Sequence, residues 1–127
     1  MTKEEVAHNY LDFLQNGDID QIVELFTDNG VVVSPLYGTK PAKDFYTVLK
    51  NDTNRSILRF DGLFFEEDTN RISLLFDYYW EISNGETVQF KVVDIIELSP
   101  ENKIEKLTII YDTVHSRKAI EDIKRTK

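Results

Sequence analysis

Apolar residues recur at helical spacing in the first part of this chain and at strand spacing in the rest, and the change comes near Arg55. Thr2 and Glu5 form a pattern typical of a helix-capping box. An apolar row at intervals of three and four residues follows it. This first row consists of Val6, Tyr10, Phe13 and Leu14. The pattern predicts a helix that begins just after Thr2.

Two more helices are predicted before Arg55. Asn16-Gly17-Asp18 ends the first helix and can cap the second, which has an apolar row of its own. Residues 31–34 predict a short strand that ends before Pro35. Thr39-Lys40-Pro41 predicts the start of the third helix, with proline in its first turn.

From Arg55 onward the alternation predicts four strands, over residues 56–66, 71–82, 87–98 and 104–111. Residues 117–124 can add a terminal helix. Helices followed by a meander of strands indicate an α+β fold, in which three N-terminal helices cover a strongly curved antiparallel sheet. The 127 residues suit one domain that spans the whole chain.

The dipeptide Asn84-Gly85 predicts a two-residue hairpin turn, and this turn assigns side chains to the two faces of the sheet. In that register Asp94 lies opposite Leu75, and Tyr79 shares the face of Asp94. The other face is too apolar to be exposed to water, so we expect it to form the interface of a homodimer, with Trp80 as its anchor. The predicted interface consists of Phe76, Tyr78, Trp80, Val93 and Ile95. A bulge between Asp77 and Ile82 would exchange the faces locally.

Asp94 interrupts an apolar row in the strand over residues 87–98. A carboxylate in such a row is costly unless it is paired, hydrogen-bonded or protonated. Two interpretations remain open for Asp94, a pocket residue with a chemical role and a buried structural acid.

Composition and charge exclude some partners. The chain has 23 acidic and 15 basic residues and a net charge of −8. Nucleic acids and anionic membranes are bound by basic surfaces, so we expect neither as a partner. No apolar run is long enough for a signal core or a membrane span, which favours a cytoplasmic location.

No metal or cofactor is predicted. The chain has no cysteine, so it has no disulfide and no thiolate metal site. Its two histidines, His8 and His115, are far apart and share no ligand spacing. We expect His8 on the polar side of the first helix and His115 in a surface loop or at the mouth of a pocket.

The order of elements resembles that of the NTF2-like superfamily, which includes ketosteroid isomerases and SnoaL-like polyketide cyclases. The segments HNYLDFLQNGDIDQIVELFTDNGVVVSPLYG (8–38) and VVDIIELSPENKIEKLTIIYD (92–112) carry the resemblance, which covers nearly the whole chain. It implies a cone-shaped α+β fold that holds a ligand between the helices and the sheet. This fold hosts enzymes, binding modules and transport factors, so it does not imply one function.

The resemblance to bacterial steroid isomerases implies roles for single residues. Tyr10, which precedes the Asn16-Gly17-Asp18 turn, matches the tyrosine donor of the family. Asp94 matches its protonated aspartic acid. Ser34 stands before Pro35, where the family has its general base, and serine is no base at neutral pH without a partner.

Two other acids are candidate bases. Asp77 can serve if its side chain points inward. Asp112 lies where SnoaL-like cyclases often place an acidic residue, although it can also cap the turn that follows. The catalytic candidates are therefore Tyr10, Asp94, Asp112 and Asp77. The predicted pocket lining consists of Ser34, Tyr79, Phe90, Val92, Leu107, Ile109 and Tyr111.

These observations predict a pocket for a small apolar organic molecule that bears a carbonyl or hydroxyl group. If the protein is an enzyme, its reaction is proton transfer next to a carbonyl, as in isomerases and cyclases. The alternative is a non-catalytic module for dimerisation or ligand binding.

Overall fold

Four helices and six strands make up the computed structural model, which describes residues 1–126. In chain order they are α1 (Lys3–Asn16), α2 (Ile19–Glu24), β1 (Phe26–Ser34), β2 (Gly38–Pro41), α3 (Ala42–Asn51), β3 (Thr53–Phe65), β4 (Arg71–Ile82), β5 (Thr87–Leu98), β6 (Ile104–Ile110) and α4 (Val114–Thr126). None of the helices within residues 1–126 is both long enough and apolar enough to cross a membrane.

Side-chain caps set the ends of α1 and α2. The Thr2 hydroxyl accepts a hydrogen bond from the Glu5 amide at 3.1 Å, and the Glu5 carboxylate accepts one from the Thr2 amide at 2.9 Å. Gly17 ends α1 in the left-handed region at φ 68°, which glycine adopts without strain. Asp18 then caps α2. The predicted capping box and helix stop are both confirmed.

The start of the third helix differs from the prediction. Gly38–Pro41 forms the edge strand β2, which pairs with β1, and α3 begins only at Ala42. Pro41 has extended backbone angles, φ −54° and ψ 147°, and occupies the N-cap position. Proline is tolerated on an edge strand because it lacks only the backbone N–H donor. Pro41 can therefore be the last residue of β2 and also precede α3.

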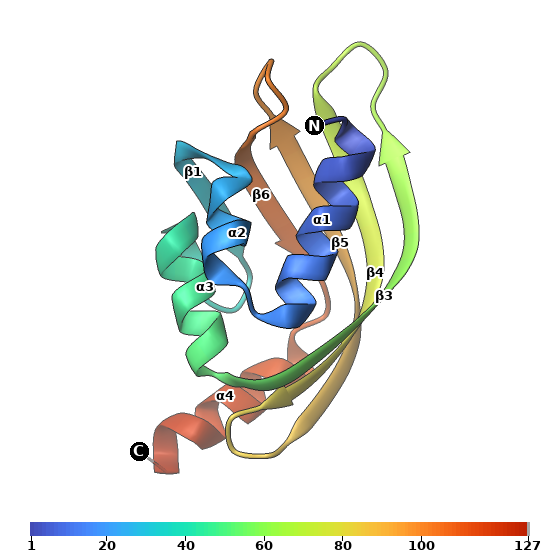
Figure 1. Ribbon diagram of the computed structural model, residues 1–127. Helices are drawn as coiled ribbons and strands as arrows, with labels where there is room; N and C mark the ends of the chain where they lie inside the picture. The colour runs from blue at the N-terminus through green and yellow to red at the C-terminus, as the bar shows by residue number, and fades with distance from the viewer. Residues whose placement is uncertain (127) are drawn as a thin grey trace.

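The six strands form one sheet in the order β2-β1-β6-β5-β4-β3. All neighbouring pairs are antiparallel except β1 and β6, which are parallel. The sheet is therefore mixed, and the expectation of a purely antiparallel sheet is wrong at this pair. Figure 1 shows the long strands bending around α1, with α2 and α3 on the same side and α4 across the end where β4 turns into β5.

The hairpin between β4 and β5 has a three-residue loop, and this corrects the predicted register. Gly85 donates its amide hydrogen to the Ile82 carbonyl, and Ile82 donates to the Glu86 carbonyl, both at 2.8 Å. Gly85 has φ 92°, whereas Asn84 is not in the positive-φ region. This geometry is a turn followed by a glycine bulge rather than a two-residue loop, which needs positive φ at both positions.

One extra loop residue exchanges the two faces of the sheet. Asp94 lies opposite Leu74 rather than Leu75, and Trp80 lies opposite Val88. Phe76, Tyr78 and Trp80 are therefore buried under the helices, with 1%, 6% and 2% of their surface exposed. These three residues belong to the core, so their prediction as a dimer interface is wrong. Val93 and Ile95 do lie on the outer face, where they are half-buried.

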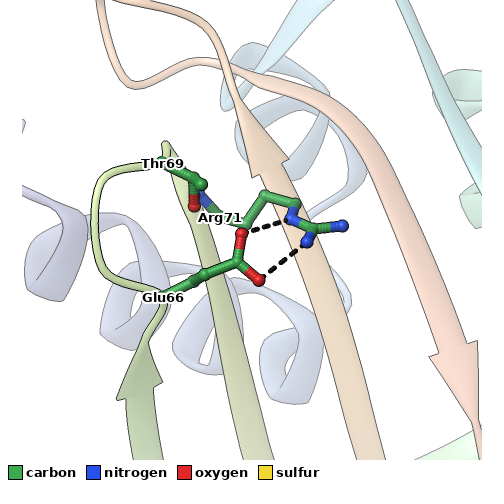
Figure 2. Close-up of polar contacts among 3 residues, drawn as sticks. All are labelled: Glu66, Thr69 and Arg71. Atoms are coloured by element: carbon green, nitrogen blue, oxygen red, sulfur yellow. Dashed lines mark hydrogen bonds and ion pairs between the residues drawn. The ribbon is translucent and has the colours of Figure 1, made fainter.

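Side chains also hold the turn between β3 and β4 (Figure 2). The Arg71 guanidinium donates two hydrogen bonds to the Glu66 carboxylate, at 3.0 and 2.7 Å. The Arg71 amide donates to the Thr69 hydroxyl at 3.2 Å. Both ends of the ion pair are exposed, so it contributes little to stability, but its paired geometry orients the turn.

Candidate functional site

A cavity of about 50 Å³ lies between α1, α3 and the inner face of the sheet. Its lining is mostly apolar and aromatic. Of the residues predicted for the site, Tyr10, Ser34, Phe90, Val92, Asp94, Ile109 and Tyr111 lie in this lining. These predicted residues are far apart in the sequence, and the fold brings them together at one place.

Asp94 is fully enclosed in this cavity. Only 1% of its surface is exposed, and neither carboxyl oxygen has a hydrogen-bond partner within residues 1–126. Burial raises the pKa of the Asp94 carboxyl well above its ordinary value, because the charged form loses its hydration. This favours the neutral acid, which has one O–H donor and further acceptor capacity.

A pair of tyrosines lies close to Asp94. The hydroxyl of Tyr10 is 2.7 Å from the hydroxyl of Tyr46, which lies on α3. Burial raises the pKa of both phenols above the ordinary value, because a buried phenolate would lose its hydration. One hydrogen is used in the bond between the two hydroxyls, so the pair keeps a second hydrogen for another acceptor.

Tyr46 was not predicted as a site residue. Tyr10 pairs with it rather than directly with Asp94, so the donor pair implied by the resemblance becomes a group of three polar side chains. The available signal was weak. Tyr46 follows Phe45 in the third helical segment, outside the apolar row of that segment.

Stacked rings form one wall of the cavity. The Phe90 ring lies 5.3 Å from that of Tyr78 and 4.3 Å from that of Tyr111, at 19° to each. The Trp80 indole packs edge-on to Phe90 and donates to the Thr53 hydroxyl at 2.8 Å. Tyr78 and Trp80 were missed as lining residues only because of the hairpin register. Such a wall suits a flat apolar ligand.

Ser34 stands where the steroid isomerases have their base, but its hydroxyl stabilises a backbone turn. It accepts hydrogen bonds from the amides of Leu36 and Tyr37, both at 3.1 Å. These bonds form a tight turn after β1 that brings Tyr37 into the cavity lining. Its acceptor sites are occupied, so Ser34 supplies a hydrogen-bond donor and no base.

Neither of the other two candidate bases reaches the cavity. Asp77 lies on the outer face, where its carboxylate is 3.2 Å from the Lys91 ammonium group. Asp112 is exposed and accepts a hydrogen bond from the Val114 amide at 3.1 Å, at the start of α4. Asp77 pairs with a cation and does not point inward, so its candidacy as the base is wrong. For Asp112 the alternative holds, since its side chain caps the turn that leads into α4.

The remaining predicted residues also lie elsewhere. Tyr79 is on the outer face, as the corrected register requires. Leu107 is fully buried in the core but does not line the cavity. His8 packs against Phe60 on the surface, and His115 is exposed on α4.

The described part of the chain offers no group of three histidine, cysteine or acidic side chains that could hold a metal ion. Among the residues that line the cavity, Asp94 alone carries a carboxyl group, and no histidine is present. Proton transfer in this cavity would therefore depend on Asp94 and the phenols.

No protein-family model matches the sequence, and no curated protein matches it. Solved structures do match the fold. TerC, co-crystallised with polyporic acid, has 18% sequence identity and a TM-score of 0.78, and the match covers 94% of this chain and 98% of that one. SalBIII, an epoxide hydrolase/cyclase-like enzyme of pyran ring formation in the polyether salinomycin, has 19% identity and a TM-score of 0.75 over 87% of this chain and 90% of that one.

A third match names the fold. It is an NTF2-like protein of unknown function from Cytophaga hutchinsonii ATCC 33406, with 16% identity and a TM-score of 0.68 over 89% of this chain and 92% of that one. Identities at this level establish the fold and not the reaction. The chain therefore has the cone-shaped NTF2-like fold that its sequence resembles.

Proposed function

We propose that this protein binds a small organic molecule in the cone and presents the neutral carboxyl group of Asp94 to an oxygen atom of that molecule. The observation that carries the proposal is the unpaired state of both Asp94 oxygens inside a mostly apolar cavity. A buried polar group without a partner costs about 1–3 kcal/mol. A ligand carbonyl or hydroxyl group would satisfy it.

The structural matches support the class of ligand. TerC was crystallised with polyporic acid, and SalBIII is described as acting in pyran ring formation. Both have this fold, and pyran ring formation concerns a cyclic organic molecule. The stacked wall of Tyr78, Phe90 and Tyr111 supplies the flat apolar surface that such a ring requires.

The chemistry best supported by these groups is donation of a hydrogen bond or proton to oxygen. A neutral acid beside a carbonyl stabilises the negative charge that develops when the neighbouring carbon loses a proton. Ser34, Asp77 and Asp112 are all engaged elsewhere. A catalysed proton transfer would therefore use Asp94 twice, first as acid to the oxygen and then, as carboxylate, as base to the carbon.

The second candidate function is a binding module without turnover. It is favoured by the lining, in which Asp94 is the one carboxyl group and no histidine is present. The cavity of about 50 Å³ is a third of the roughly 150 Å³ apolar cavity that holds benzene. A six-membered ring would have to displace one of the lining side chains.

A matched pair of probes tests the role of Asp94. Cyclohexanone should bind about tenfold more tightly than methylenecyclohexane, since only the ketone accepts a hydrogen bond. The indole N–H signal of Trp80, the single tryptophan, reports binding by NMR. Asp94→Leu should abolish the preference, whereas Asp77→Leu on the outer face should keep it. Equal binding of both probes to the unmodified protein would refute the proposal.

The same experiment in D₂O separates the two functions. The protein would be an enzyme of proton transfer if it exchanged the hydrogens next to the cyclohexanone carbonyl for deuterium faster than buffer alone does. This exchange should be lost in Asp94→Leu. Binding of the ketone without such exchange would identify the binding module.

We also propose that a second copy of the chain covers the outer face of the sheet. Leu75, Val93 and Ile110 are direct neighbours across three strands there, and Ile95 continues the apolar surface. On this face Ile110 is 53% exposed. Phe64, which lies opposite Ser73 on the neighbouring strand, is 56% exposed. An apolar surface continuous over several strands is typical of an interaction site.

Val93→Glu should halve the mass measured by light scattering, because it buries a charge at the centre of that face. Thr47→Glu, on the exposed side of α3, is the control and should leave the mass unchanged. A dimer that survives Val93→Glu would exclude this face as the interface.

A further inference from the structure

A second hollow, of about 150 Å³, lies beside the cavity that contains Asp94. It is formed by the C-terminal ends of α1 and α3, the helix α2 and the beginning of β3. Its inner surface is apolar, with Leu14, Ile22 and Leu49. Its lining also includes the polar residues Gln15, Asn16, Lys50, Asn54 and Arg55.

Only side chains separate the two hollows. Leu14, Leu49 and Tyr78 line both of them. The Tyr78 hydroxyl is 2.8 Å from the hydroxyl of Ser56, which lines the second hollow. Joining the two spaces therefore requires these shared side chains to move, Tyr78 among them.

The polar residues of the second hollow differ in charge from the rest of the chain. The sequence has 23 acidic residues against 15 basic ones, yet Lys50 and Arg55 line this hollow and no acidic residue does. The Lys50 side chain crosses Gly17, with its Cε 3.9 Å from the position a Cβ would take there. Asp18 lies just outside the lining. Hydrogen bonds from Gln21 lower the pKa of its carboxyl, and the charge of Lys50 adds a smaller effect in the same direction.

The end of α3 accounts for part of this arrangement, since a cation in the last turn of a helix is stabilised by the helix dipole. The dipole does not account for the amide donors of Gln15, Asn16 and Asn54, or for Arg55 on the neighbouring strand. These exposed side chains carry hydrogen-bond donors beside the apolar part of the lining, a combination that suits a carboxylate on an apolar body.

We propose that the two hollows form one elongated site for an organic carboxylate. Its ring and oxygen lie at Asp94, its apolar middle passes Leu14 and Leu49, and its carboxylate is bound by Lys50 with Arg55 nearby. This inference rests on the proposed function at Asp94 and extends it, because it assigns the charge and length of the ligand.

The probe is 4-benzoylbutyrate, which has a ketone beside a ring and a carboxylate at the other end, and 4-benzoylbutyramide is its neutral counterpart. NMR should show the butyrate shifting both the Trp80 indole signal and the Gly17 amide signal, while acetophenone, which lacks the chain, shifts only that of Trp80. The carboxylate should bind about tenfold more tightly than the amide at low salt.

Lys50→Gln should weaken the carboxylate about fivefold or more and leave the amide unchanged. Lys43→Gln is the matched control, because Lys43 is an exposed lysine on the same helix outside the hollow. Equal binding of carboxylate and amide, or equal effects of the Lys43 and Lys50 variants, would overturn the elongated site while the ketone site stands. If no ketone shifts the Trp80 signal, the proposed function fails and this inference fails with it.

Discussion

Asp94→Asn should make the protein more stable than the unmodified chain at neutral pH, and the gain should grow as the pH rises. Burial raises the pKa of Asp94 in the folded state above its unfolded value of 3.8. Between those two pKa values the folded state binds more protons than the unfolded state, so the free energy of unfolding falls with rising pH. Each pH unit in that window removes about 1.4 kcal/mol. Asparagine cannot ionise, so the variant lacks this loss.

Urea unfolding of both proteins between about pH 4 and pH 8 measures the difference. Asp77→Asn is the control, because Asp77 is on the outer face beside Lys91 and has no place in the cavity. The prediction would be contradicted if the difference in free energy of unfolding did not change with pH. It would also be contradicted if the unmodified protein became more stable relative to Asp94→Asn as the pH rose. Either result would mean that Asp94 works as an ionised and paired group.

Trp80→Ala should lower the free energy of unfolding by about 3–5 kcal/mol, the range for removing a large buried side chain. Only 2% of Trp80 is exposed, its ring packs on Phe90, and its N–H group bonds to Thr53. The substitution leaves a hole in the core, and the Thr53 hydroxyl loses the donor from the indole while it keeps its own bond to the Leu49 carbonyl. Urea unfolding followed by circular dichroism measures the loss without needing the tryptophan signal.

The neighbouring residue supplies the comparison for this variant. Tyr79→Ala lies on the outer face and should cost about 1 kcal/mol or less in the monomer. The two-residue hairpin would place Trp80 outside and Tyr79 inside, so it requires the opposite order of effects. The pair of variants therefore tests the register itself.

The ends of α1 and of the central strands could be predicted from the sequence because local chemistry determines them. The box of Thr2 and Glu5 and the left-handed Gly17 each act within a few residues. The predicted bounds of β4 and β5 agree with the structure for the same reason, since turn residues flank two long alternating runs.

The register of the hairpin could not be fixed in this way. Asn84-Gly85 is compatible both with a two-residue loop and with a three-residue loop that ends in a glycine bulge. Both faces of β4 carry large apolar residues, Leu75 and Tyr79 on one and Phe76 and Trp80 on the other, so the alternation did not choose between them. The more aromatic face was the better candidate for the core, and the prediction assigned it to a dimer instead.

At the site, the position of Asp94 in an apolar strand was sufficient to identify it as unusual. Its partners depend on packing between elements far apart in the chain. Tyr46 meets Tyr10 because their side chains reach each other from α3 and α1, and Ser34 is engaged by a turn in which two backbone amides donate to its hydroxyl. Neither relation leaves a periodic signal in the sequence.

The parallel pairing of β1 with β6 has a consequence for the order of folding. The strands β3 to β6 are joined in sequence, so each can pair with its predecessor as the chain emerges. β1 can join the sheet only when β6, which starts at Ile104, is available to pair with it. β2 pairs only with β1, so it joins the sheet with β1. Contacts over such a separation slow folding because a long loop must close first. We expect the hairpins to form early and the edge that holds Ser34 and Tyr37 to assemble last, so the cavity is completed only in the final step.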